Sequence, residues 1–137
     1  MRLPVQEQYE TKLYVFTWVN KTSGSDVAPT TVTLEVPGVA SAQAVSAPVD
    51  VSQAKSIHVE IDTKTLTDHV ATSIDINVYG GATAAIRQLT RWTGADAVTA
   101  DAIQPLAVTV GPSCLWLLLD HNAGGRADVI ARVYVRF

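Results

Sequence analysis

The chain has little charge, one cysteine and few aromatic residues, and these shortages exclude several classes of protein. Charged residues make up 17% of its 137 residues, and the net charge is −3. Proteins that bind nucleic acid in general carry strongly basic surfaces, so we expect no nucleic-acid partner. The single cysteine, Cys114, excludes an internal disulfide and a zinc site built from several cysteines. It lies in the apolar run "SCLWLLLD", so we interpret it as a small buried side chain.

No segment has the composition of a membrane-spanning or targeting element. The longest apolar run, "CLWLLL" (114–119), has the length of a strand and falls far short of the about 20 residues that a helix needs to cross a bilayer. The first residues, "MRLPVQEQYETK" (1–12), lack the apolar core of a signal peptide. We therefore expect no membrane partner, no signal peptide and synthesis in the cytoplasm of the producing cell.

Apolar and polar residues alternate along most of the chain, which is the side-chain period of a β-strand. The alternation is clean in "SIHVEID" (56–62) and "SIDINVYG" (73–80), where Ile and Val occupy one face. We interpret the polar residues on the other face as the solvated side of an antiparallel sheet. Residues 39–54 predict an edge strand or a connection, and residues 93–105 a loop with at most one helical turn. The further predicted strands are 11–19, 30–36, 83–92, 106–110, 113–120 and 128–137.

Eight or nine short strands separated by turn residues predict an all-β fold with little or no helix. We expect a single-domain antiparallel β-sandwich over residues 1–137. Jelly-roll and immunoglobulin-like topologies both fit this pattern. The Cys…Trp…Cys arrangement of immunoglobulin domains is absent, which favours a jelly-roll-like sandwich. The sequence does not give the order of the strands.

Residues that carry catalysis or hold cofactors form no recognisable pattern in this chain. The G-x-S-x-G turn of serine hydrolases, the Walker loop and the dinucleotide-binding glycine motif are all missing. His58 shares a strand face with Glu60 and Asp62, a set of ligand types that a metal ion uses, but a solvated polar face explains the three residues better. We predict no catalytic, cofactor-binding or metal-binding residues and no enzymatic activity. A small hydrolase or a metal-dependent enzyme is the third alternative.

Arginine and aromatic residues give the most distinctive surface pattern. Every arginine except Arg2 lies at position 87 or later. If the strands 83–92 and 128–137 lie on the same side of the sandwich, their outward residues form one patch. Arginine and aromatic side chains are enriched at protein–protein contacts, so we predict a protein interface there; an ordinary solvated face is the alternative. The predicted interface consists of Arg87, Leu89, Arg91, Ile130, Arg132, Tyr134 and Arg136.

Trp92 and Tyr79 are candidates for stacking against a ligand. Trp92 ends a predicted strand and precedes a loop, a position that suits binding, and aromatic faces are the platforms on which sugar rings stack. Trp18 shares a strand face with Tyr14 and Phe16, which indicates core packing. Trp116 lies between apolar neighbours and predicts burial in the core or at an interface. A carbohydrate-binding β-sandwich module, as in a receptor-binding or adhesin head, is therefore the leading alternative function.

Taken over its full length, the chain resembles the small auxiliary proteins of tailed-bacteriophage virions, in particular head decoration or cement proteins. The features that carry the resemblance are the all-β pattern, the low charge, abundant Ala, Val and Thr, and polar connections such as "TSGSDVAPTT" (22–31). The resemblance implies a non-enzymatic structural protein of a viral particle that oligomerises and binds the major capsid protein or other virion subunits. It would stabilise the shell through many modest contacts repeated by symmetry.

Overall fold

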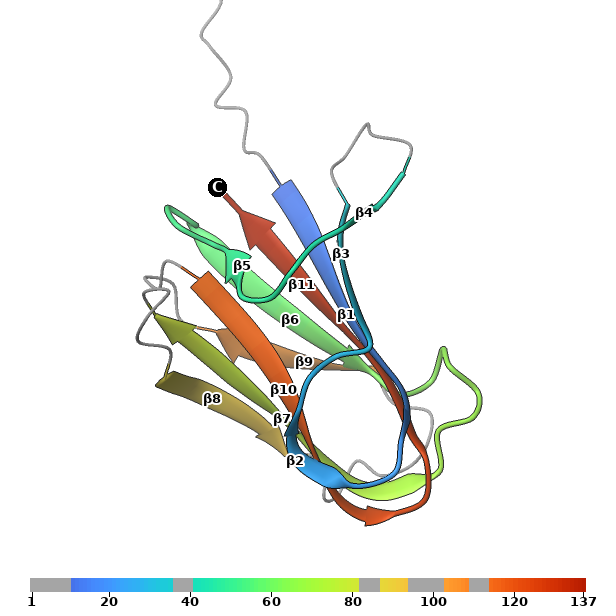
Figure 1. Cartoon of the computed structure of the whole chain (residues 1–137). Helices are drawn as coiled ribbons and strands as arrows, with labels where there is room; N and C mark the ends of the chain where they lie inside the picture. Colours follow the sequence, from blue (N-terminus) through green and yellow to red (C-terminus); the bar gives the residue numbers. More distant parts are fainter. Residues whose placement is uncertain (1–10, 36–40, 82–86, 94–102, 109–113) are drawn as a thin grey trace, which may run out of the picture.

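A computed structural model describes residues 11–35, 41–81, 87–93, 103–108 and 114–137, and of residues 87–93, 103, 104 and 107 it describes the backbone alone. These residues form eleven strands and no helix (Figure 1). The strands are β1 (Thr11–Lys21), β2 (Gly24–Val27), β3 (Thr31–Glu35), β4 (Gln43–Ala44), β5 (Val49–Asp50), β6 (Ser56–Asp62), β7 (Ala71–Gly81), β8 (Arg87–Thr93), β9 (Ile103–Val108), β10 (Cys114–Gly124) and β11 (Ala127–Arg136).

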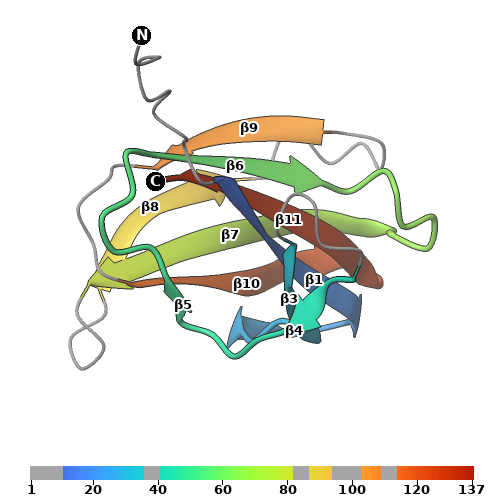
Figure 2. The ribbon, with the colours of Figure 1, turned by 90° about the horizontal axis from the view of Figure 1, so that it is seen from above.

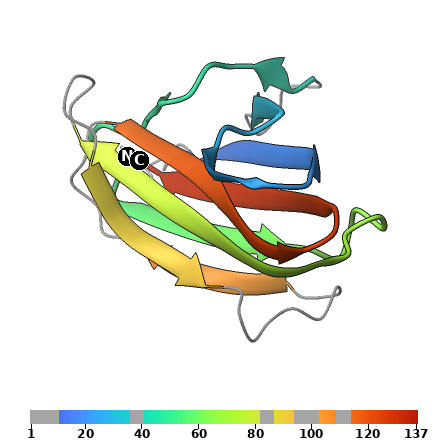
Figure 3. The same cartoon turned by 60° about the horizontal axis from the view of Figure 1, so that its bottom comes forward.

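The strands pair antiparallel in two sheets, so the predicted all-β sandwich is confirmed. Sheet A has the order β4-β3-β1-β11-β6-β9, and sheet B has the order β2-β10-β7-β8, with β5 pairing beside β10. Figures 2 and 3 show β7, β8 and β10 in a different layer from β6 and β11. The strand number exceeds the eight or nine expected, because β2 lies between the predicted strands 11–19 and 30–36, and the stretch 39–54 contains both β4 and β5.

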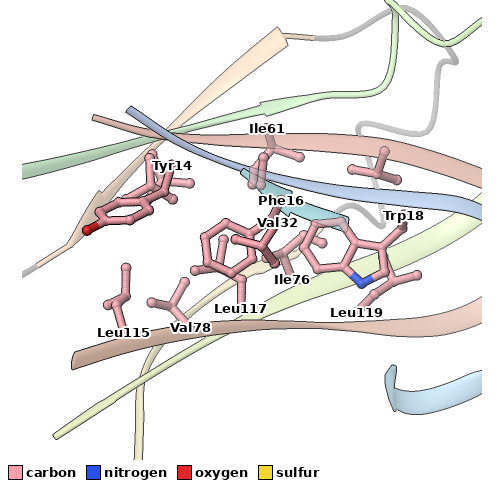
Figure 4. Close-up of a cluster of buried hydrophobic side chains, with 14 of the residues drawn as sticks. Tyr14, Phe16, Trp18, Val32, Ile61, Ile76, Val78, Leu115, Leu117 and Leu119 are labelled. Atoms are coloured by element: carbon pink, nitrogen blue, oxygen red, sulfur yellow. The ribbon is translucent and has the colours of Figure 1, made fainter. Parts of the chain in front are cut away.

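The core lies between the sheets and is filled by the alternating apolar residues that the sequence indicated. The Ile and Val residues of β6 and β7 are buried, as predicted, and so is the single cysteine. Tyr14, Phe16 and Trp18 of β1 meet the leucines of β10 across the core (Figure 4). The C-terminal strand β11 lies between β1 and β6, and its inward residues are fully buried: Val129, Ala131, Val133 and Val135. Each of the three valine side chains contributes about 1.5–3 kcal/mol when removed from water.

Strand β9 begins three residues earlier than predicted and contains Pro105 opposite Glu60 of β6. A proline cannot donate a main-chain hydrogen bond, and it is tolerated in a sheet on an edge strand. β9 is the last strand of sheet A in the observed order, which accounts for the proline.

The expectation of a solvated outer face is wrong for three polar residues of β6 and β7. Asp62, Asp75 and Asn77 lie on the outer faces of their sheets, yet each is less than 10% exposed. Buried polar groups need hydrogen-bond partners, and each of the three has one from a distant part of the chain. His58 and Glu60 remain exposed or partly exposed, as expected.

Candidate functional site

The outward residues of β11 form the C-terminal half of the predicted interface. They lie in the middle of sheet A. Ile130 is 9% exposed, Arg132 and Tyr134 are partly exposed, and Arg136 is exposed. Their neighbours in sequence all face the core, so these four side chains share the outer face of the sheet. The alternation in the sequence predicted this arrangement correctly.

Strand β1 adds three residues to this face that the sequence analysis did not select. The antiparallel register places Leu13 beside Tyr134, Val15 beside Arg132 and Thr17 beside Ile130. All three residues of β1 are partly exposed. We call the set Leu13, Val15, Thr17, Ile130, Arg132 and Tyr134 the outer A face. The alternation with Tyr14, Phe16 and Trp18 already indicated that the three residues of β1 face outward. The sequence did not indicate that β1 pairs with β11.

Arg132 is held by two carboxylates of the neighbouring strand β6. Its Nη1 donates to Glu60 Oε1 at 3.1 Å and to Asp62 Oδ2 at 2.7 Å. The Asp62 side chain is fully buried, and the side chains of Arg132 and Glu60 are 23% and 29% exposed. The guanidinium therefore balances a buried charge within the fold. Arg132→Glu would place a third carboxylate beside Glu60 and Asp62 and would destabilise the fold. This variant therefore cannot be used to measure the effect of Arg132 on association alone.

Asp62 also organises the loop that follows β6. Its Oδ1 accepts hydrogen bonds from the main-chain N–H groups of Lys64 at 2.7 Å and Thr65 at 2.9 Å, and the Thr65 hydroxyl donates to Oδ2. Burial alone would raise the pKa of Asp62, but the bonds from Thr65, Arg132 and Lys64 outweigh it and lower the pKa to about 2. The carboxylate is therefore ionised at neutral pH. On Arg132, burial lowers the pKa, but the bonds to both carboxylates raise it overall.

The other half of the predicted interface lies in the other sheet. Arg87, Leu89 and Arg91 belong to β8, the edge strand of sheet B, whereas β11 is central in sheet A. The two strands are therefore not neighbours in one sheet, so the backbone does not place them on the same side of the sandwich, which was the condition for a single patch. The side chains of β8 lie outside the described residues, and a contact role for these three residues stays a prediction.

The two residues proposed for stacking lie on the neighbouring strands β7 and β8 but are not direct partners, because the register pairs Trp92 with Ile76 and Tyr79 with Gln88. The side chain of Trp92 lies outside the described residues, so its stacking role stays a prediction. Tyr79 is partly exposed and lies on the outer face of sheet B, where its partner across β10 is Trp116. Trp116, for which the sequence predicted burial, is partly exposed.

Asn77 is the centre of a polar cluster on the outer face of sheet B. Its amide donates to Asp120 Oδ2 at 2.9 Å and to Asp26 Oδ1 at 3.2 Å. The Tyr79 hydroxyl donates to Asp26 Oδ1 at 2.9 Å, and the Asp26 main-chain N–H donates to Asp120 Oδ1 at 2.7 Å. These bonds tie β2 to β10 and β7, so the cluster serves at least to fix the edge strand.

A second polar network lies at the turn between β10 and β11. Arg126 donates from Nε at 2.6 Å and from Nη2 at 3.0 Å to the buried carboxylate of Asp128, which also accepts from the main-chain N–H of Asn20 at 2.9 Å. The Asp128 N–H donates to Nδ1 of His69, which is 4% exposed, at 3.0 Å. Burial lowers the pKa of His69, and the nearby Asp128 carboxylate only partly opposes this shift. His69 is therefore a neutral structural acceptor.

Comparisons with protein-family models, with curated proteins and with solved structures find no match to this chain. In the part of the chain that the structure describes, no group of three or more His, Cys, Asp or Glu residues is arranged to hold a metal ion. The described residues also include no helix with the length and apolar character to span a membrane. The assignment of function rests on the surfaces described above.

Proposed function

We propose that this chain is a non-enzymatic structural protein of a viral particle, a decoration or cement protein of the capsid. In this proposal it acts through protein–protein contacts and is made in the host cytoplasm. The observation that carries the proposal is the outer A face. Two central strands there present Leu13, Val15 and Tyr134, all partly exposed, around the partly exposed Arg132 and its bond to the buried Asp62. Apolar and aromatic side chains of this kind supply the buried centre of protein interfaces.

The strand order supports the proposal as well. We infer a jelly roll from the two four-stranded sets β1-β11-β6-β9 and β2-β10-β7-β8, to which β3, β4 and β5 are additions. Jelly rolls occur in viral capsid proteins, in lectins and in cupins, so the architecture admits the proposal without selecting it. The outer A face is the feature that favours a structural role among these classes.

The mechanism of such a protein would be the repetition of modest contacts. A face made of six residues cannot supply a large interface alone, but copies linked by homo-oligomerisation engage the shell together. The partners that fit are a second copy of this chain and the major capsid protein or other virion subunits. Arg136, exposed at the end of β11, would lie at the rim of such a contact, where charge affects the rate of association more than its strength.

Two valine-to-serine variants test the role of the outer A face. Val15→Ser removes apolar surface from its centre, whereas Val70→Ser changes a 60% exposed valine of the β6–β7 loop. We expect Val15→Ser to lower the fraction of the protein that oligomerises or sediments with the particle, and Val70→Ser to leave both unchanged. Thermal unfolding of both variants separates loss of association from loss of folding.

The genes beside this one identify the particle to use in the sedimentation assay. A neighbourhood without virion genes would contradict the viral assignment. A protein that stays monomeric at high concentration, and that does not sediment with the identified particle, would overturn the structural role itself.

A specific observation favours carbohydrate binding as the second candidate. Tyr79 and Trp116 are direct cross-strand neighbours on the outer face of sheet B, and Asp26 and Asp120 lie next to them. Aromatic faces beside carboxylates offer a sugar both stacking and hydrogen bonds. Binding on a glycan array that is lost in Tyr79→Ala, and separately in Trp116→Ala, would favour this function over the first.

A further inference from the structure

Strand β10 is paired along one edge only in part. Strand β7 pairs with it from Cys114 to Gly124. On the opposite edge, β5 pairs with Cys114 and Leu115, and β2 pairs with Leu119 and His121. Figure 1 shows β5 and β2 near opposite ends of β10. Trp116, Leu117 and Leu118 therefore have no strand partner on this edge among the described residues.

A groove opens at this interruption. It has a volume of about 470 Å³, and its walls come from the connection between β2 and β3, from β3, from the end of β4, from the connection into β5 and from β10. Among the described residues, no charged side chain lines it. The lining residues are Ala28, Pro29, Thr30, Thr31, Val32, Thr33, Ala44, Val45, Ala47 and Trp116. One wall segment, residues 28–33, follows directly after β2, and another, residues 44–47, ends just before β5. The groove therefore lies beside the stretch of β10 that neither β2 nor β5 covers.

The wall contributed by β10 contains an unused hydrogen-bond donor. The indole Nε1 of Trp116 is buried and has no hydrogen-bond partner among the described residues. By contrast Trp18, which lies in the core, donates its indole N–H to the main-chain oxygen of Val27 at 2.9 Å. A buried donor without an acceptor is destabilising, so a ligand that supplies an oxygen here gains free energy on binding.

We propose that this groove binds an extended, uncharged segment of a partner polypeptide, which pairs with β10 as an added strand. A peptide backbone supplies donors and acceptors at the spacing that the edge of a strand requires, and its carbonyl groups are acceptors suited to an indole N–H. The absence of charged residues in the lining selects against charged side chains, because they would lose hydration without gaining a partner.

The flanking strands limit the length of the paired segment. β2 and β5 leave three positions of β10 open, which correspond to about 10 Å of extended chain. Such a segment forms only a few hydrogen bonds, and each adds little net free energy because it replaces a hydrogen bond to water. The bound segment therefore pairs over three residues and turns away at both ends, with a dissociation constant in the millimolar range. The groove is separate from the outer A face, so this inference is independent of the viral assignment.

The test uses the peptide acetyl-GTVTG-amide, whose central residues favour extended structure and whose glycines allow both ends to turn away. It is titrated into the ¹⁵N-labelled protein. We expect amide shifts confined to Trp116, Leu117, Leu118 and the segments lining the groove, together with a shift of the Trp116 indole N–H. A matched peptide methylated on its three central nitrogens cannot donate main-chain hydrogen bonds, and we expect it not to bind.

Two alanine-to-arginine variants provide the control in the protein. Ala44 lines the groove and is exposed, and Ala123 is an exposed residue of β10 outside the groove. Ala44→Arg should abolish the shifts, and Ala123→Arg should retain them, with thermal unfolding close to the wild type in both. Absence of shifts in the wild-type protein overturns the proposal. Equal binding of the methylated peptide also overturns it, in favour of a pocket for small apolar ligands.

Discussion

Removing the guanidinium of Arg132 should destabilise the protein and make its stability less sensitive to acid. In Arg132→Met the long apolar stem is kept, but the fully buried Asp62 loses its charged partner. Removing one partner of a fully buried ion pair costs about 3–5 kcal/mol. The cost here is smaller, because Arg132 and Glu60 are partly solvated and Asp62 keeps its bonds from Lys64 and Thr65. We expect a loss of about 2 kcal/mol near neutral pH, the value of a hydrogen bond to a charged group.

The pH dependence follows from the pKa of Asp62. In the folded protein this pKa is about 2, below the ordinary value of 3.8. The stabilisation is therefore complete above the ordinary value and is lost as the pH falls through the folded value. It amounts to roughly 2 kcal/mol at most, and to less where solvent screens the pair. In Arg132→Met the pKa of Asp62 rises, so the difference in stability between wild type and variant should shrink on acidification.

Urea unfolding near pH 7 and near pH 2.5 measures both effects, with Arg136→Met as a matched control on the same strand face. Arg136 is exposed, and we expect its replacement to change the free energy of unfolding by less than about 0.5 kcal/mol. A cost below that limit for Arg132→Met, or a cost that is the same at both pH values, would refute the role assigned to this ion pair. Combining Arg132→Met with Asp62→Asn in a double-mutant cycle measures the coupling directly.

Three further substitutions test other parts of the fold. Burial lowers the pKa of His69, so the contribution of this residue to stability is present above the ordinary pKa near 6.5 and is lost as the pH falls through the folded pKa. In His69→Gln we expect the melting temperature to depend less on pH between about pH 7 and 5. Gly124 has φ of +92°, and a Cβ there would lie 2.3 Å from the Thr72 main-chain nitrogen. Gly124→Ala should cost about 2–4 kcal/mol in urea unfolding, and clearly more than Gly125→Ala, where the nearest atom belongs to a flexible valine. Trp18→Phe removes the indole bond to the end of β2 and should cost roughly 2 kcal/mol, a result contradicted by an unchanged melting temperature.

Several features of the fold could be predicted because they depend on neighbours in sequence. The backbone of a strand places successive side chains on opposite faces, so alternation identified the inward residues of β6, β7 and β11 before their partners were known. The burial of Cys114 followed in the same way from its apolar surroundings. Short pairings escaped this reasoning, because the two residues each of β4 and β5 carry no pattern long enough to recognise.

The candidate site was predicted in part for the same reason. Ile130, Arg132, Tyr134 and Arg136 do share one face, but the residues beside them come from β1, more than 100 positions away in the chain. The predicted union of β8 with β11 failed because the strands belong to different sheets. Alternation fixes which face a residue occupies and says nothing about which strand lies next to it.

The sequence by itself determined the β-strands, the composition of the core and the faces of individual strands, because each of these follows from the local geometry of an extended backbone. Only the tertiary structure decided which polar residues are buried and which surfaces exist. Asp62 is withdrawn from water because strand pairing brings it to Arg132, 70 residues away. The groove beside β10 exists because β2 and β5 pair with different parts of one edge and leave its middle open.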